Sequence, residues 1–209
     1  MAAEDRAAYR DFFGEAYPGV ASLAGLLEAE AGVRGLMGPR ELERLWPRHL
    51  VNCGAVAALL PPGAAVIDVG SGAGLPGLVV ALMRPDVTME LVDSMLRRTV
   101  WLAEAVAALG LGNTTVTRAR AEELAGRRQA GAVLSRAVGP LDRLAQWCGP
   151  LLATGGLFLA MKGETAAEEL AAAGAALKRH RLEQAEVLRL APVAGVEATY
   201  VVRAVKTKP

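Results

Sequence analysis

AVIDVGSGAGLPGL, residues 65–78, is an apolar run that ends in Asp68 and passes directly into a glycine-rich turn. The glycines of this turn are Gly70, Gly72, Gly74 and Gly77. Because glycine has no Cβ, such a turn bends sharply and lets the backbone approach a ligand closely. A turn of this kind between a strand and a helix binds either a dinucleotide, through its pyrophosphate, or S-adenosyl-L-methionine, through its amino-acid part. The residues around the turn have to distinguish these two ligands.

The whole chain has the composition of a globular domain of ordinary size, with 209 residues, 53% hydrophobic and 22% charged, and a net charge of +1. No apolar run is long enough to span a bilayer, and residues 1–20 lack the basic start and apolar stretch of a signal peptide. We therefore expect a cytoplasmic protein without a membrane partner. Cys53 and Cys148 are far apart and match no metal-ligand spacing, so we expect two buried, reduced thiols and no metal.

From residue 64 onward, apolar runs typical of strands alternate with helical patterns. We predict strands at 65–69, 88–92, 113–117, 131–134 and 156–161, and helices at 76–83, 95–109, 121–125, 140–149 and 165–178. This alternation predicts a parallel sheet covered by helices on both faces. No helix separates the last two apolar runs, 183–190 and 197–205, so we expect an antiparallel hairpin at one edge of the sheet.

The first 60 residues show helical patterns from about residue 4, with breaks near Pro18, Gly32 and Pro39. Pro47 interrupts the last of these patterns and predicts a kink or two separate pieces. We therefore divide the chain into an N-terminal helical extension, 1–60, packed on a core domain, 61–209.

In an open α/β sheet, ligands bind beyond the carboxyl ends of the strands, so residues directly after each strand are candidates for chemistry. They are Asp68, Asp93, 118–122, Ser135, Arg136, Lys162 and Gly163. Asp93 follows the glycine turn by about 20 residues, where a carboxylate accepts hydrogen bonds from the ribose of an adenosine. The alternative is that Asp93 caps the next helix. Asp68 is placed to order the loop by accepting hydrogen bonds from backbone amides.

The glycine turn also satisfies the dinucleotide pattern, which makes a nicotinamide-dependent oxidoreductase the alternative function. Three observations oppose it. Asp68 would place a carboxylate near two phosphates, and Pro76 removes an amide donor from the anion site. The chain also ends in a hairpin instead of a second mononucleotide-binding half. S-adenosyl-L-methionine, a cation without phosphates, is compatible with all three observations.

Four motifs in this order and spacing, IDVGSGAGLPGL, LVDSMLRR, LSRAVGP and AMKG, resemble the bacterial 16S rRNA guanine-N7 methyltransferases (RsmG, also called GidB). The resemblance covers residues 40–165, and RELERLWPRHLVNC resembles the helix before the family's first strand. It implies a class I, Rossmann-like methyltransferase with a mainly parallel seven-stranded sheet. The implied reaction methylates N7 of a single guanine, guanine 527, in the decoding region of 16S ribosomal RNA. The implied substrate is the 30S subunit or an assembly intermediate, methylated by a monomer.

The resemblance also assigns site residues. It implies cofactor contacts at Gly70, Leu75, Ala121, Glu122 and Arg136, with Asp93 in the ribose position. With Asp68, Gly72 and Gly74 of the turn, these residues form the predicted cofactor site. The catalytic candidates are Arg136 of SRA and Lys162 of MKG. Many members carry a WN…NLT motif in the N-terminal helices, which this chain lacks.

Arg136 is expected to hold guanine O6 or a flanking phosphate, and Lys162 to provide a point charge to the same backbone. The alternative for both is a structural ion pair with Asp68 or Glu122. Guanine N7 carries a free lone pair, so in-line attack on the sulfonium methyl needs no general base. Catalysis is expected to come from alignment and from exclusion of water.

The remaining charged and aromatic residues allow a functional and a structural interpretation. Three arginine pairs, Arg97 with Arg98, Arg118 with Arg120 and Arg127 with Arg128, form a phosphate-binding rim or are merely solvated. His49 faces the cofactor or serves packing, and the three tryptophans are expected in the core. A non-catalytic RNA-binding module fits poorly, because a net charge of +1 attracts little RNA; the same neutrality favours a preformed ribonucleoprotein substrate.

Overall fold

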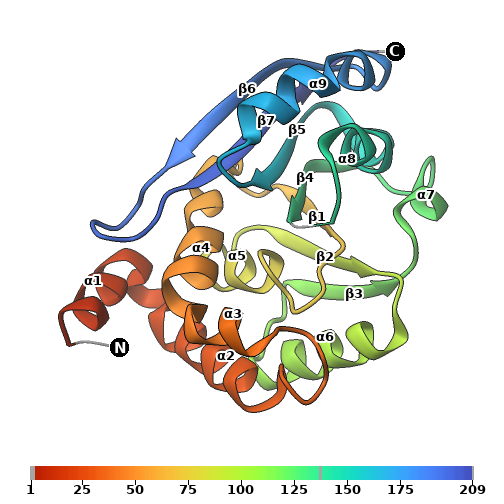
Figure 1. The fold of residues 1–209 in the computed structure, drawn as a ribbon. Helices are drawn as coiled ribbons and strands as arrows, with labels where there is room; N and C mark the ends of the chain where they lie inside the picture. The colour runs from red at the N-terminus through yellow and green to blue at the C-terminus, as the bar shows by residue number, and fades with distance from the viewer. Residues whose placement is uncertain (1–2, 137, 209) are drawn as a thin grey trace.

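A seven-stranded sheet forms the centre of the molecule in a computed structural model that describes residues 3–136 and 138–208 (Figure 1). The strand order is β3-β2-β1-β4-β5-β7-β6. The strands are β1 (Ala65–Val69), β2 (Thr88–Asp93), β3 (Thr114–Arg118), β4 (Ala130–Arg136), β5 (Leu152–Lys162), β6 (Leu182–Leu190) and β7 (Thr199–Lys206). The first five strands are parallel, and the β6–β7 hairpin adds to β5 in antiparallel orientation. The predicted sheet is confirmed.

Strand β5 begins at Leu152, earlier than the predicted residue 156. Leu152 pairs with Ala130, but the register then shifts, so that Leu157 pairs with Ala132. Gly155, with a φ of +82°, lies in the extra length of β5 that this shift requires. Because the irregularity interrupts the alternation of side chains, the sequence pattern shows only the second part of the strand.

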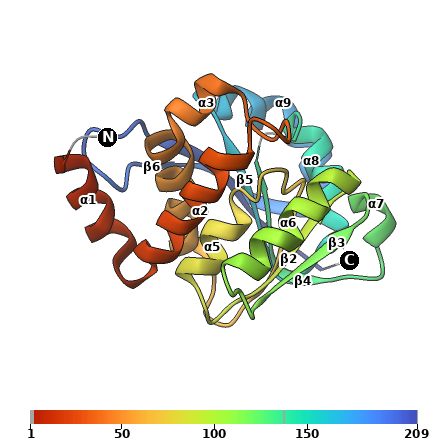
Figure 2. The ribbon, with the colours of Figure 1, turned by 90° about the horizontal axis from the view of Figure 1, so that it is seen from below.

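Helices cover both faces of the sheet, as predicted (Figures 1 and 2). The helices are α1 (Ala3–Phe13), α2 (Tyr17–Glu30), α3 (Pro39–Glu43), α4 (Asn52–Ala55), α5 (Gly77–Met83), α6 (Leu96–Ala108), α7 (Ala121–Leu124), α8 (Leu141–Cys148) and α9 (Ala166–Arg179). Helices α1 to α6 pack with one face of the sheet in one hydrophobic core, and α7, α8 and α9 pack with the other face in a second. None of the described helices is long and apolar enough to cross a membrane.

The N-terminal segment shares its core with the sheet. Trp46 stacks on Tyr9 and Tyr17 at ring-centroid distances of 5.6 and 5.7 Å, and side chains from Tyr9 to Leu60 join the core that α5 and α6 line. The break predicted at Pro47 is confirmed, because a π-helical segment, Leu45–Val51, separates α3 from α4. Division of the chain at residue 60 stays a prediction.

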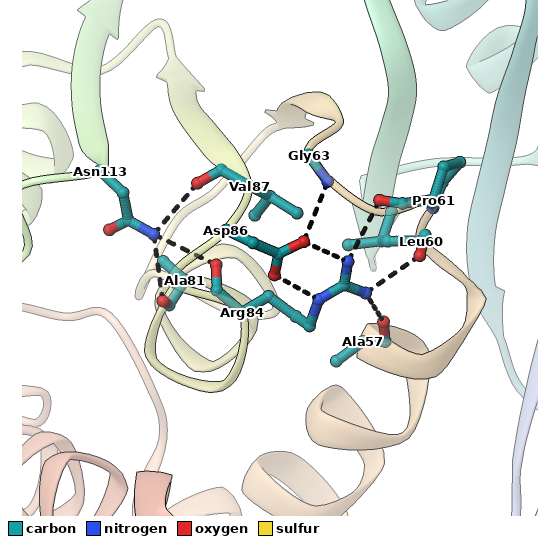
Figure 3. Close-up of polar contacts among 9 residues, drawn as sticks. All are labelled: Ala57, Leu60, Pro61, Gly63, Ala81, Arg84, Asp86, Val87 and Asn113. Atoms are coloured by element: carbon teal, nitrogen blue, oxygen red, sulfur yellow. Dashed lines mark hydrogen bonds and ion pairs between the residues drawn. The ribbon is translucent and has the colours of Figure 1, made fainter.

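Arg84, directly after α5, links the loop before β2 to the N-terminal segment that leads into β1 (Figure 3). Its guanidinium donates hydrogen bonds to the carbonyl oxygens of Ala57, Leu60 and Pro61 at 2.8 to 3.1 Å. The same group forms a two-pronged ion pair with Asp86, at 2.7 and 2.8 Å, which holds the pKa of that carboxyl well below its usual range. Arg84 therefore fixes the chain where it enters β1.

Replacement of Arg84 by alanine is expected to lower the free energy of unfolding by about 2 kcal/mol, because it leaves three carbonyl groups without their donor and Asp86 without its ion-pair partner. Urea denaturation measures the loss. Arg128→Ala is the matched control: its exposed side chain meets Glu90 at 3.6 Å, and such a surface pair contributes about 0–1 kcal/mol. Equal losses in the two variants would contradict the assigned role of Arg84.

Candidate active site

The glycine turn is held from below by Asp68, whose side chain is completely buried. Asp68 Oδ2 accepts a hydrogen bond of 3.0 Å from the backbone N–H of Gly77, at the start of α5. A Cβ at Gly77 would lie 2.3 Å from Leu91 Cδ2 and 2.7 Å from Asp68 Oδ2, so only glycine fits there. The expected ordering of the loop by Asp68 is confirmed. Burial raises the pKa of this carboxyl to about 7.

Asp93, at the end of β2, ties the glycine turn to the start of α6. Its Oδ2 accepts a hydrogen bond of 3.1 Å from the N–H of Gly72, and its Oδ1 accepts one of 2.9 Å from Met95. Arg98 adds an ion pair of 3.3 Å. The helix-start interaction is therefore present, and the same carboxylate also borders a cleft.

This smaller cleft, of about 240 Å³, brings together four residues of the predicted cofactor site: Gly70, Asp93, Ala121 and Glu122. Val138 and Trp147 add apolar surface to it. Gly70 has a φ of +74°, and a Cβ there would lie 2.5 Å from Val138 Cγ2. The bare backbone at Gly70 therefore lets the chain after β4 close over the turn.

Five residues of the predicted cofactor site do not border this cleft in the described part of the chain: Asp68, Arg136 and three residues of the turn. Gly72 has its N–H bound to Asp93, and Gly74, with a φ of +91°, packs so closely on Leu78 that a Cβ would lie 2.2 Å from its Cδ1. Leu75 is buried in the core that α5 and α6 line. Gly72, Gly74 and Leu75 therefore maintain the conformation of the turn.

A larger cleft, of about 610 Å³, lies between the N-terminal segment and the ends of β4, β5 and β7. Arg136, predicted among the cofactor contacts, borders this cleft and not the smaller one. Its guanidinium donates a hydrogen bond of 2.8 Å to Cys53 Sγ and contacts His49 Nδ1. The ion pair with Asp68 or Glu122 considered as an alternative is not among the contacts found between described residues.

His49 connects Arg136 to an acidic partner. Its Nε2 lies 2.7 Å from Glu41 Oε2, while its Nδ1 faces the guanidinium. Burial, followed by the charge of Arg136, lowers the pKa of His49 to about 4. His49 is therefore neutral at pH 7, with Nδ1 as acceptor and the proton on Nε2.

Lys162, the second catalytic candidate, is buried and already neutralised. Its Nζ lies 2.7 Å from Glu169 Oε2 and donates a hydrogen bond of 2.7 Å to the carbonyl oxygen of Gly139. The acidic partner is Glu169 and not Asp68 or Glu122. Lys162 thus links the loop after β4 to α9, and both Lys162 and Glu169 line the larger cleft.

The predicted arginine rim is wrong in one pair. Arg127 and Arg128 lie before β4, at the amino ends of the strands, where Arg128 borders a separate cleft beside Thr88 and Ala130. Arg118 and Arg120 are exposed at the carboxyl end, and Arg98 turns inward to Asp93. A residue that precedes a parallel strand lies at the opposite edge of the sheet from one that follows it, so these pairs cannot form one rim.

A family model described as GidB, rRNA small subunit methyltransferase G, matches residues 20–194 of this chain. The chain belongs to this family. Methyl transfer to small-subunit rRNA is therefore its activity, and S-adenosyl-L-methionine is the cofactor, as the motifs predict. The oxidoreductase alternative is excluded.

Similar proteins named Ribosomal RNA small subunit methyltransferase G cover most of the chain. The protein from Thermobifida fusca is 50% identical over 96% of this chain and 84% of its own length. That from Streptomyces coelicolor is 52% identical over 87% and 76%. Among solved structures, a predicted O-methyltransferase from Agrobacterium tumefaciens, 18% identical, covers 77% of this chain and 81% of its own with a TM-score of 0.59. This structural likeness confirms the Rossmann-like methyltransferase fold.

Sequence reasoning missed several residues of the two clefts in this family member. Trp101 is buried as expected; Trp147 is half-buried and borders the smaller cleft while it packs against the second core. Asn52 and Tyr200, not considered from the sequence, line the larger cleft. The spacing of His49, Asn52 and Cys53 is a usable signal, because residues three and four positions apart share one helical face.

Proposed function

We propose that this chain methylates N7 of one guanine in 16S ribosomal RNA, guanine 527 in the family's numbering of the RNA. The observation that carries the proposal is the adjacency of the two clefts at the end of β4. Arg136 borders the larger cleft, and Val138, two residues later, borders the smaller one. A base in one cleft and a cofactor in the other would meet at this strand end.

The smaller cleft fits S-adenosyl-L-methionine in the kinds of groups it presents. Asp93 provides a carboxylate that accepts hydrogen bonds from ribose hydroxyls, and Val138 and Trp147 provide apolar surface for a flat adenine ring. When bound, the cofactor supplies an electrophilic methyl group. The protein's part is to hold the acceptor in line with that group.

In the larger cleft, Arg136 provides a donor for guanine O6 and leaves N7 free. His49 and Cys53 hold the guanidinium from one side, which restricts its rotation before the base arrives. Because guanine N7 carries a lone pair without a proton, no residue has to act as a general base. Lys162 is proposed as a positioning residue that holds the loop after β4 through Gly139.

Asp93→Asn is expected to weaken binding of S-adenosyl-L-homocysteine about 10- to 100-fold, because a charged acceptor is replaced by a neutral amide. Isothermal titration calorimetry measures the dissociation constant. Asp142→Asn, the same change at an exposed position of α8, is the control and should leave it unchanged. Equal affinities in the two variants would remove Asp93 from the cofactor site.

Transfer of labelled methyl groups tests the reaction itself. The substrates are 30S subunits, assembly intermediates and naked 16S ribosomal RNA, followed by mapping of the modified base. We expect a single N7-methylguanine, formed best on a ribonucleoprotein particle, by a cytoplasmic protein that sediments as a monomer. A different modified base would contradict the proposal.

A further inference from the structure

Asn52, the first residue of α4, has a buried polar atom that is not used within the fold. The side chain lines the larger cleft and the residue is only 7% exposed. Its Oδ1 has no hydrogen-bond partner among residues 3–136 and 138–208. Buried amide oxygens are rarely left unpaired, because they lose their hydrogen bonds to water on folding. An unpaired acceptor on a cleft wall therefore points to a donor supplied by a ligand.

The neighbours of Asn52 limit what that ligand can be. Arg136 is held by Cys53, the next residue along the chain, and by His49, one helical turn earlier. A fixed cationic donor and a free neutral acceptor thus lie on the same wall of the cleft. A ligand that complements this wall presents an acceptor beside a donor.

We infer that Asn52 is a specificity-determining residue, whose amide oxygen accepts hydrogen bonds from N1–H and the 2-amino group of the target guanine. Guanine presents O6, N1–H and the 2-amino group in a row on one edge, so Arg136 donates to O6 while Asn52 accepts from the adjacent donors. N7 lies on the other side of O6 and stays free. This inference rests on the proposed function, since it concerns the base that is methylated.

Adenine offers the opposite pattern. It carries an amino group where guanine has O6, and its N1 has no proton. In the adenine case, Asn52 Oδ1 would remain unpaired and the Arg136 guanidinium would face a donor. A site built to hydrogen-bond a substrate group rejects an analogue that lacks it, because the buried partner is left without a hydrogen bond.

The test compares 30S subunits reconstituted with guanosine or inosine at the target position, because inosine lacks only the 2-amino group. We expect the wild-type protein to methylate the inosine substrate with a kcat/KM about tenfold lower. Asn52→Ala should lower kcat/KM on guanosine by a similar factor and bring the guanosine-to-inosine ratio to about 1. Asn52→Asp keeps an acceptor and should keep the preference.

Asn113→Ala is the matched control. Asn113 donates to three carbonyl oxygens and is not among the described residues that line the larger cleft, so its loss should lower the melting temperature without changing the ratio (Figure 3). Equal wild-type rates on guanosine and inosine would overturn the inference, as would an unchanged ratio in Asn52→Ala. The comparison of guanosine and inosine with the wild-type protein tests the inference even if Asn52→Ala does not fold. Failure of the wild type to methylate guanosine at all would instead overturn the proposed function, and the inference with it.

Discussion

Arg136→Ala is expected to lower methyl transfer to 30S subunits about 100-fold or more while binding of S-adenosyl-L-homocysteine is retained. Arg136 borders the larger cleft and is separate from Gly70, Asp93, Ala121 and Glu122 in the smaller one. Loss of a charged hydrogen bond to the reacting base, together with loss of its alignment, accounts for an effect of about 3 kcal/mol. Single-turnover transfer measures the rate, and calorimetry measures cofactor binding.

Two further variants separate chemistry from folding. Arg136→Lys keeps the charge but loses the forked geometry that meets Cys53 and His49, so it should remain at least about tenfold slower than the wild type. Arg143→Ala removes an exposed arginine of α8 and should have no effect. Normal turnover in Arg136→Ala would eliminate the assignment. Equal losses of methyl transfer and of cofactor affinity would show that Arg136 contributes to cofactor binding, as the resemblance implies.

Asp68 is expected to make the protein less stable as the pH rises from about 4 to about 7. Burial raises the pKa of Asp68 to about 7 in the folded state, above its ordinary value of 3.8. Between these values the folded protein binds more protons than the unfolded chain, so the free energy of unfolding falls with rising pH and levels off above about pH 7. The expected loss is on the order of a few kcal/mol.

Asp68→Asn isolates this contribution, because the amide keeps the shape and an acceptor for Gly77 but does not titrate. His49 acts in the opposite direction: its pKa is lowered to about 4, so it stabilises the fold as the pH rises from about 4 to about 6.5. Only the difference between the wild type and Asp68→Asn reports on Asp68. Urea denaturation at several pH values measures it, and a difference that does not vary with pH would contradict the raised pKa of the buried carboxyl.

The glycine turn shows how far local sequence carries the prediction. Positive φ at Gly70, Gly72 and Gly74 is allowed by residue type, and the strand and helix around the turn follow from periodicity. The topology rules for parallel sheets then place Asp93 beside the turn. These features depend on short stretches of chain, so the sequence predicts them well.

The outcome for Arg136 and Lys162 depends on contacts that no local pattern contains. Arg136 meets Cys53 and His49, which are 83 and 87 positions earlier in the chain. Lys162 pairs with Glu169 of the following helix, α9, and not with Asp68 or Glu122. The sequence offers several acidic residues as possible partners for each cation. Only the packing of the N-terminal segment and α9 determines which residues each cation contacts.

By itself, the sequence determined the alternation of strands and helices in a parallel sheet, the antiparallel hairpin, the glycine turn and the methyltransferase family, because periodicity, residue type and motif spacing are properties of the chain alone. Only the tertiary structure decided which side chains face each other across the larger cleft. It placed Arg136 among His49, Asn52 and Cys53, and Arg128 at the far edge of the sheet. The physical reason is that burial and pairing depend on neighbours distant in sequence, which the packing of helices on the sheet brings together.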